Sequence, residues 1–273
     1  MGHVTGFGDL LRDWRKRRRL SQLDLAMEAE VSQRHLSFVE SGRAQPSREM
    51  VLHLAERLEV PLRERNFLLV AAGYAPVFPE RALDDPAMMA ANEAVQRVLT
   101  GHEPHPAIAV NRHWNLLSAN RAFAPLLAGI DGALLAPPVN VLRLSLHPRG
   151  AAPRIANLPE WRAHILARLR RQVEVSADAT LMALLEELRG YPVPASTRPV
   201  PMADLDSVAV PLRLAMPEGT LSFLSTTMVF GTPMDITLAE LTIEAFFPAD
   251  AATAEATRRL TSAATDPHPG PPP

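Results

Sequence analysis

The chain has 273 residues, 47% hydrophobic and 21% charged, which is long enough for two modest domains that each bury a core. It contains no cysteine, so disulfide bonds, thiolate catalysis and cysteine-ligated zinc are excluded, and its net charge of −2 argues against nonspecific adhesion to nucleic acid. No apolar run approaches the roughly 20 residues of a membrane-spanning helix, and the opening MGHVTGFGD has no apolar signal region. We therefore expect a cytoplasmic protein with no membrane partner.

Residues 1–75 predict an all-α domain of five short helices. The first helix is marked by four apolar side chains at helical spacing, Phe7, Leu10, Leu11 and Trp14. Serines that can cap a helix N-terminus precede the next three helices, at Ser21, Ser32 and Ser47. Asp24 lies where it would complete a capping box, and Gly42 stands where a left-handed residue would end the third helix.

The rest of the chain changes character. Residues 76–106 are interrupted by prolines and predict a connector with a helix at about 87–100. Residues 107–255 predict a mixed α/β (α+β) domain, with two short strands around RHW at 112–114, a helix from Asn120 to about Leu127, helices at 160–173 and 178–189, and strands at 208–214, 220–230 and 241–247. Residues 256–273 are expected to form a disordered tail, since the stretch SAATDPHPGPPP cannot pack.

The start of the third predicted helix is crowded with polar side chains. The pairs Ser21-Gln22 and Ser32-Gln33 lie 11 residues apart, which fits a helix of about eight residues, a tight turn and a second helix start. In a helix-turn-helix, one such N-terminus approaches phosphates and the other enters the major groove, where glutamine suits adenine and arginine suits guanine. We therefore expect contacts to double-stranded DNA from Gln22, Ser32, Gln33, Arg34, His35, Ser37 and Arg43.

The charge distribution agrees with this interpretation. Residues 1–75 hold 12 basic and 10 acidic side chains, and half of the basic ones lie in RDWRKRRR at 12–19. A local positive patch of this kind can neutralise phosphates. The alternative is that the third helix and the arginines form an ordinary solvated surface.

The segment LRDWRKRRRLSQLDLAMEAEVSQRHLSFVESGRAQPS resembles the Cro/repressor-type (XRE) helix-turn-helix family over about residues 7–72. The resemblance implies a phosphate contact by Gln22 and a brace between Arg15 and Glu40 on the third helix, and it implies base contacts by Gln33, Arg34 and Ser37. We also assign Arg43 to a phosphate. The chain departs from the family at Glu30, where glycine is common in the turn, and in its arginine-rich run.

The second domain carries no catalytic signature. The sequence has no G-x-G-x-x-G, P-loop, H-E-x-x-H or G-x-S-x-G motif, so no catalytic residue is expected. The nearest candidate for a metal site is HEPH at 102–105 with His113; its prolines predict a loop, and we interpret the histidines as surface residues that bind no metal. The alternative is an enzyme tethered to DNA, but no sequence motif supports it.

The segment HPAIAVNRHWNLLSANRAF at 105–123 resembles the opening of a PAS-like fold. Together with the helix-turn-helix and the segments NVLRLSLHPRG, NLPEWRAHI and EAFFPADAAT, the whole chain resembles the MmyB-like transcription regulators. The resemblance implies a C-terminal PAS-like domain that binds a fatty-acid-like ligand, with no other cofactor. It implies a transcription regulator, which we expect to bind two DNA half-sites as a homodimer. The alternative is a second domain that mediates only dimer or protein contacts.

Two sets of residues are candidates for ligand binding. The strand at 220–230 is apolar on both faces, so Phe223 and Met228 are candidates for a pocket, as is Trp114, which could equally be a core anchor. Arg143 and His147 are four residues apart and share a face in a helix or a strand, so they could hold a carboxylate. In the alternative, Arg143 pairs with a nearby acid and His147 closes a loop before Pro148.

Overall fold

The structure, a computed structural model, describes residues 6–176, 178–192 and 210–263. The chain divides into two compact units, Met1–Asp85 with Gly231–Ala239, and Pro86–Phe230 with Glu240–Pro273. The predicted boundaries need two corrections. The expected connector 76–106 is split between the units at residue 85, and a short segment from the second half of the sequence belongs to the first unit. No described helix is long and apolar enough to cross a membrane.

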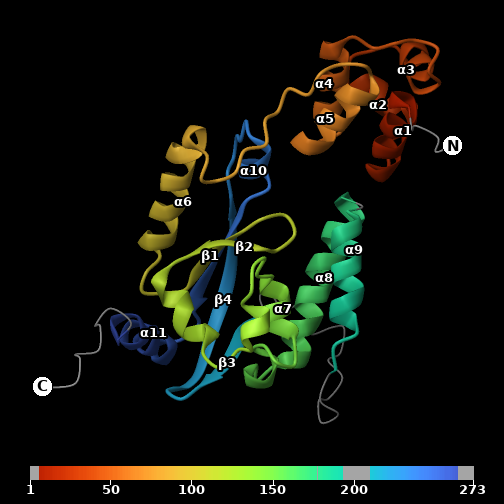
Figure 1. The fold of residues 1–273 in the computed structure, drawn as a ribbon. Helices are drawn as coiled ribbons and strands as arrows, with labels where there is room; N and C mark the ends of the chain where they lie inside the picture. Colours follow the sequence, from red (N-terminus) through yellow and green to blue (C-terminus); the bar gives the residue numbers. More distant parts are fainter. Residues whose placement is uncertain (1–5, 177, 193–209, 264–273) are drawn as a thin grey trace, which may run out of the picture. The chain divides into compact units, whose positions relative to one another are not determined.

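The first unit contains the five predicted helices (Figure 1), namely α1 (Phe7–Arg17), α2 (Gln22–Glu28), α3 (Gln33–Glu40), α4 (Arg48–Arg57) and α5 (Leu62–Ala71). Their apolar faces form one buried core around Leu11, Leu25 and Leu36. The predicted caps are present: Ser32 and Ser47 accept from the third residue of their helices, and Ser21 and Asp24 form the reciprocal capping box. Gly42 is left-handed, with φ of 70°.

Residues 231–239, with the short helix α10 (Ile236–Ala239), pack in the first unit although they connect two strands of the second. The Ile236 amide donates to the Pro79 carbonyl at 2.8 Å, and Ile236 is buried. Arg81 and Asp235 form an ion pair at 3.2 Å, and the Asp235 carboxylate also accepts from the Thr237 amide. The helix-turn-helix unit is therefore completed by a segment that lies about 150 residues further along the sequence.

The second unit is built on a five-stranded antiparallel sheet of order β2-β1-β5-β4-β3. Its strands are β1 (Ala107–Val110), β2 (Leu116–Ala119), β3 (Leu212–Met216), β4 (Gly219–Val229) and β5 (Thr242–Pro248). The predicted strand at 208–214 lies partly outside the described residues, and β3 begins only at Leu212. The unit is α+β, and its opening has the strand, turn and strand of the expected PAS-like start, followed by a 3-10 helix.

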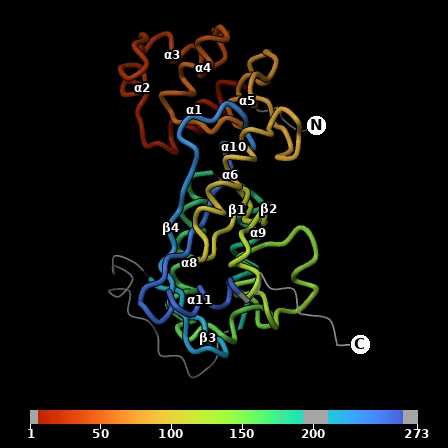
Figure 2. Tube along the Cα trace, turned by 90° about the vertical axis from the view of Figure 1, so that its left-hand side faces the viewer, coloured from red at the N-terminus to blue at the C-terminus, as the bar shows by residue number. Residues whose placement is uncertain are grey.

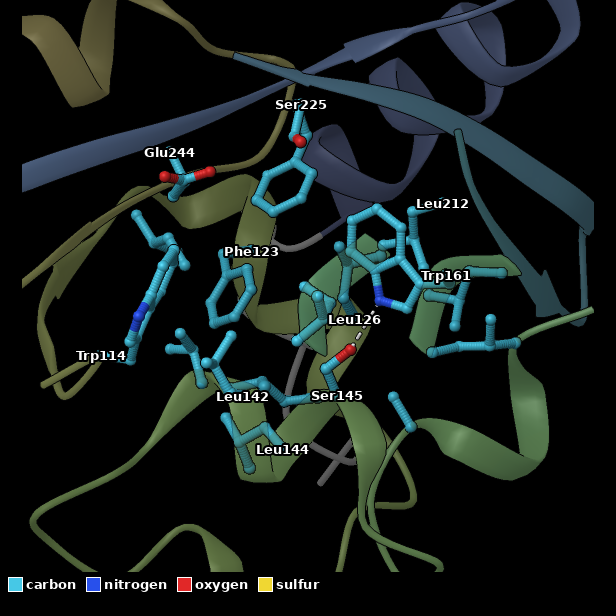
Figure 3. Close-up of a pocket in the computed structure, with 18 of the residues that line it drawn as sticks. Trp114, Phe123, Leu126, Leu142, Leu144, Ser145, Trp161, Leu212, Ser225 and Glu244 are labelled. Carbon is cyan, nitrogen blue, oxygen red and sulfur yellow. Dashed lines mark hydrogen bonds between the residues drawn. The ribbon is translucent and has the colours of Figure 1, made fainter. Parts of the chain in front are cut away.

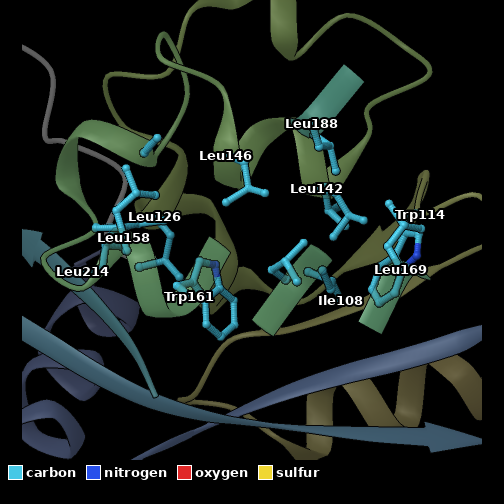
Figure 4. Close-up of a cluster of buried hydrophobic side chains, with 14 of the residues drawn as sticks. Ile108, Trp114, Leu126, Leu142, Leu146, Leu158, Trp161, Leu169, Leu188 and Leu214 are labelled. Atoms are coloured by element: carbon cyan, nitrogen blue, oxygen red, sulfur yellow. The ribbon is translucent and has the colours of Figure 1, made fainter. Parts of the chain in front are cut away.

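Helices cover both faces of this sheet. One face is covered by α7 (Val141–Leu146), α8 (Leu158–Ser176) and α9 (Ala179–Arg189), and the other by α6 (Met89–Gly101) and α11 (Ala251–Ala263) (Figures 1 and 2). Short 3-10 helices occupy Pro86–Met88, Arg121–Leu127, Gly132–Leu134 and Ala152–Arg154, labelled η1 to η4. The main core lies between the sheet and α7, α8 and α9, around Trp161, Leu169 and Leu188 (Figure 4).

Two expectations about local structure are wrong. Asn120 does not cap a helix through its side chain; its amide instead bonds to the backbone of Leu99, His105 and Ala107, and η2 follows as a 3-10 helix that contains Pro125. Residues 256–263 are helical rather than disordered, as part of α11. Small side chains, among them Thr257 and Thr261, are buried there, and packing by such residues has no strong hydrophobic pattern to reveal it. The rest of the predicted tail lies outside the described residues.

Candidate functional site

The N-terminus of α3 presents its polar side chains to solvent. Gln33 and Arg34 are exposed, and the Arg34 guanidinium lies over the Phe38 ring at 5.4 Å from its centroid. Such stacking reduces the number of conformations that the arginine samples while its donors remain directed outward. The hydroxyl of Ser32 accepts the His35 amide at 3.1 Å, so this predicted contact residue also caps the helix. The helix start is therefore rigid, and its long donors are exposed.

The other predicted contact residues flank this helix start. His35 and Ser37 are half-buried on α3, whereas Arg43 is exposed directly after the left-handed Gly42. The Arg43 amide donates to the Phe38 carbonyl at 2.8 Å, which fixes the backbone of the turn. Arg43 thus lies beyond the opposite end of α3 from Arg34, as a residue that positions the helix on a phosphate would.

Gln22 makes a contact within the domain that was not predicted. Its side-chain amide donates to Glu40 Oε2 at 2.7 Å, so Gln22 stabilises the contact between α2 and α3. An amide group has a second N–H, which can still reach a phosphate. This contact could not be predicted, because Gln22 and Glu40 are 18 residues apart and on different helices.

Arg15 and Glu40 form the expected ion pair between α1 and α3. Arg15 Nε and Nη2 donate to the two carboxylate oxygens at 2.6 and 2.9 Å, and Glu40 is only 2% exposed. Burial by itself raises the pKa of Glu40, but the hydrogen bonds from Arg15 and Gln22 and the charges of Arg15 and Arg12 outweigh it and hold that pKa below its usual value. Gly8 allows the close approach of the two helices, since a Cβ there would lie 2.4 Å from the Glu40 carbonyl oxygen.

Part of the arginine-rich run is structural. Arg12 donates to the Glu40 carbonyl at 2.8 Å, and Arg18 donates to the carbonyls of Leu58 and Glu59 at 2.8 and 2.9 Å. Together with Arg15, these are three arginines that join helices, whereas Lys16 and Arg19 remain exposed. The basic surface that the run offers to phosphates is smaller than its composition suggests.

The second unit encloses a cavity of about 100 Å³ between the sheet and its helices (Figure 3). Aliphatic and aromatic side chains from β1, η2, α7, α8 and β3 form most of the lining, among them Phe123, Leu142 and Trp161. An engineered apolar cavity of ~150 Å³ accepts benzene. The space is therefore that of a small ring or a stretch of alkyl chain, and a longer molecule needs side chains at the mouth to move.

Five polar residues also line this cavity, and the sequence analysis missed them: Ser145, His164, Arg168, Ser225 and Glu244. The Ser145 hydroxyl accepts from the Trp161 indole N–H at 2.9 Å. His164 and Arg168 are four residues apart on α8, on the side that also carries the buried Trp161 and Ile165. Polar residues at helical spacing on an apolar face were the available signal. Glu244 is buried in β5, and nothing in the sequence pairs it with α8.

Of the apolar residues proposed to bind a ligand, only Trp114 lines this cavity. Phe223 is fully buried in the core, and Met228 is partly exposed on the opposite face of the sheet. Side chains alternate along β4, and Ser225 lines the cavity while Thr227 bonds to Glu244 on the same face, so Met228 points to the other face. Met228 and Phe223, predicted to bind a ligand, therefore do not line this cavity, and Phe223 lies in the core beside it.

The proposed carboxylate site at Arg143 and His147 is also corrected. Neither residue lines the cavity. Arg143 donates to both carboxylate oxygens of Glu187 at 2.8 and 2.7 Å, and the Tyr191 hydroxyl donates to the same carboxylate at 2.5 Å. His147 lies past the end of α7 and packs edge-on against Tyr191. The alternative interpretation, an arginine paired to a nearby acid and a histidine that closes a loop, describes the structure.

The histidines of the HEPH loop and His113 each bond to a different partner. His102 bonds to the Phe246 carbonyl, His105 to the Thr257 hydroxyl, and His113 to Asp178. Among the described residues, no group of three or more histidine, aspartate or glutamate side chains has an arrangement that could hold a metal ion.

Comparisons with known proteins agree with both units. Residues 7–68 match the model of a helix-turn-helix domain, and residues 91–260 match that of the MmyB-like transcription regulator ligand binding domain. Over 117 residues the chain is 31% identical to the uncharacterized HTH-type transcriptional regulator RghRB of Bacillus subtilis (strain 168). The matched region covers 42% of this chain and 82% of that relative. The chain therefore belongs to the MmyB-like transcription regulators, DNA-binding regulators that join a helix-turn-helix domain to a ligand-binding domain.

Proposed function

We propose that this regulator binds two operator half-sites as a homodimer and that its second unit senses a small apolar ligand with a fatty-acid-like chain. The observation that carries the proposal is the cavity, whose lining is mostly aliphatic and aromatic and which lies between the sheet and α7 and α8. Apolar pockets with a few polar groups are the usual form of small-molecule sites. We expect no catalytic role and no cofactor other than this ligand.

The DNA-binding part of the proposal rests on α3. Its first turn exposes Gln33 and Arg34, which can read base edges, and Arg43 beyond its other end can contact a phosphate. Operators of such domains are commonly two-fold, with one half-site for each protomer.

The homodimer is supported by the face of the sheet that lies opposite the cavity. Leu224 and Phe247 are cross-strand partners there, and both are exposed, as is Met228 further along β4. Clustered exposed apolar side chains are typical of protein contacts. This observation also favours the second candidate function, in which the unit mediates only protein contacts.

Binding of apolar probes to the full chain separates the two functions. We expect a ligand at 100 times its Kd to stabilise the protein by about 2.7 kcal/mol and to change its affinity for operator DNA. Leu127→Trp should fill space in the cavity that Leu127 lines and abolish the stabilisation, whereas Leu224→Trp on the other sheet face should leave it intact. A wild type that no apolar probe stabilises, together with loss of the dimer in Leu224→Trp, would favour the contact-only function, and turnover of a substrate would favour an enzyme.

A further inference from the structure

The polar residues of the cavity lie on strands β4 and β5 and helix α8, apart from Ser145 of α7, whose hydroxyl accepts from Trp161. Glu244 is 4% exposed, and Arg168 donates to its two carboxylate oxygens at 3.0 and 2.6 Å. The Thr227 hydroxyl joins them, since it donates to Glu244 at 3.1 Å and accepts from Arg168 at 2.9 Å. Figure 3 shows Glu244 and Ser225 at the sheet side of the cavity, opposite the apolar residues of α7.

Arg168 is held in this position by a second contact. Its guanidinium lies over the Trp114 ring, 4.6 Å from the centroid, and Trp114 is fixed in turn because its indole N–H donates to Gln172 at 2.8 Å. Stacking and a bidentate carboxylate together fix the plane of a guanidinium. Arg168 is therefore committed to Glu244, and its charge is compensated within the protein.

The lining as a whole carries no net charge. Arg168 and Glu244 are the only residues in it with a permanent charge among those that the structure describes, and they cancel. The third titratable residue is His164, which stacks on Trp161. Burial and the neighbouring Arg168 and Arg171 lower the pKa of His164, so its imidazole is neutral at physiological pH and can donate and accept hydrogen bonds.

An ionised carboxylate would not be compensated in such a lining. It would bring a second negative charge beside a carboxylate that is already buried and whose arginine is already bound. An uncharged group meets no such penalty. The Ser225 hydroxyl, the His164 imidazole and the Glu244 oxygens offer both donors and acceptors to a hydroxyl or a carbonyl group.

We propose that the ligand of this cavity is a neutral amphiphile, an apolar chain that ends in an uncharged hydroxyl, ester or amide, and not an ionised carboxylic acid. The inference rests on the proposed function, that the second unit binds an apolar ligand, and it specifies the polar end of that ligand. Selectivity comes from Glu244, which neutralises Arg168 and thereby keeps the only permanent cation of the described lining from attracting an acid.

Three probes of equal chain length test this with the full protein at about pH 8, where a fatty acid with an ordinary carboxyl pKa is ionised. We expect decanol and methyl decanoate to bind at least about tenfold more tightly than decanoate, which corresponds to about 1.4 kcal/mol. Decanoate that binds as tightly as the neutral probes would overturn the inference and leave the proposed function standing. If none of the three probes binds, the proposed function fails and the inference fails with it.

Glu244→Gln provides the decisive variant, because it removes the compensating charge and keeps the shape. Arg168 then becomes an uncompensated cation, and the preference should reverse toward decanoate by about tenfold or more. The matched control is Glu187→Gln, which breaks the same kind of bidentate pair, with Arg143, away from the cavity lining and should keep the wild-type preference. A reversal in both variants would assign the effect to net charge and overturn the inference.

A measurement on the wild type keeps the test independent of the stability of these variants. The affinity for decanoic acid should rise by about tenfold or more as the pH falls through the pKa of the free acid, since only the neutral form enters, whereas the affinity for decanol should stay constant over the same range. An affinity for decanoic acid that stays constant, or falls with pH, would contradict the proposed head-group chemistry.

Discussion

At the scale of single residues, Arg34 is the side chain on which we expect sequence recognition to depend most. It is exposed on the first turn of α3 and stacked on Phe38. Arg34→Ala should cost about 1–3 kcal/mol of operator binding and relax the preference at one base pair in each half-site. Fluorescence anisotropy with operator and random DNA measures both effects.

Arg43 supplies the matched control for this prediction. It is an exposed arginine at the other end of α3, assigned to a phosphate, so Arg43→Ala should weaken binding to operator and random DNA by similar factors. An equal loss on both DNAs for Arg34→Ala as well would remove its assignment to a base.

Glu30 carries backbone strain in the turn between α2 and α3. Its φ is 54°, in the left-handed region that costs a residue with a Cβ about 1–2 kcal/mol. Glu30→Gly should therefore stabilise the domain by about 0.5–1 kcal/mol, after the larger entropy of the unfolded glycine is subtracted. Glu28→Gly removes an exposed carboxylate at the last residue of α2, where the backbone is helical, and should instead destabilise by about 0.5–1 kcal/mol. Chemical denaturation of both variants tests the opposite signs.

At the scale of whole elements, the pair of Arg15 and Glu40 joins α1 to α3. Glu40→Ala leaves Arg15 buried without its partner, so we expect a loss of about 3–5 kcal/mol at neutral pH without DNA present. Hydrogen exchange of residues 7–71 measures the stability of this unit by itself. Glu28→Ala, at an exposed position of α2, should change it little. A Glu40→Ala protein that keeps wild-type protection and loses only DNA affinity would show that the pair does not brace the domain.

The pH dependence of this pair follows from the lowered pKa of Glu40. Because the folded carboxyl has a lower pKa than the unfolded one, at about 4.3, the ion pair contributes fully above that pH and loses its contribution as the pH falls through the folded value. The difference in unfolding free energy between wild type and Glu40→Ala should therefore narrow below about pH 4. A difference that stays constant from neutral pH into this range would contradict the role of the charge.

The segment 231–239 acts on the first unit as an element that is distant in sequence. Asp235 is buried, pairs with Arg81 and accepts the Thr237 amide, so Asp235→Ala should reduce the hydrogen-exchange protection of the helix-turn-helix unit by about 1–3 kcal/mol. Met234→Ala, at an exposed residue of the same segment, is the control and should have little effect. Equal hydrogen-exchange protection in both variants would mean that the segment contacts the first unit without stabilising it.

At the scale of the whole molecule, a two-fold dimer makes the spacing of half-sites a geometric prediction. The half-sites should lie about one helical turn of DNA, or a multiple, apart. Inserting about five base pairs between them places them on opposite sides of the duplex and should reduce affinity to that of a single half-site, and about ten inserted base pairs should restore much of it. Gel-shift titration of such operators checks this; affinity that is independent of spacing would argue for independent monomers.

The sequence by itself determined the local structure and the family. A cap needs a hydroxyl that accepts a hydrogen bond from a backbone amide three residues later, as at Ser21 and Ser32. Helical periodicity is equally local, so caps and helices could both be predicted. The helix-turn-helix motif is also compact in sequence, and the chain belongs to the family that its residues resemble. Where a pattern was absent, as in the small buried residues of α11, prediction failed.

Only the tertiary structure decided which polar side chains meet. Arg168 and Glu244 are 76 residues apart, and their pairing depends on how α8 lies across a sheet whose strand order is not sequential. The same reason explains the contact of Gln22 with Glu40, the pairing of Arg143 with Glu187, and the packing of 231–239 in the first unit. Periodicity tells which face of an element a side chain occupies, but not which other element covers that face, and the chemistry of this cavity depends on the second fact.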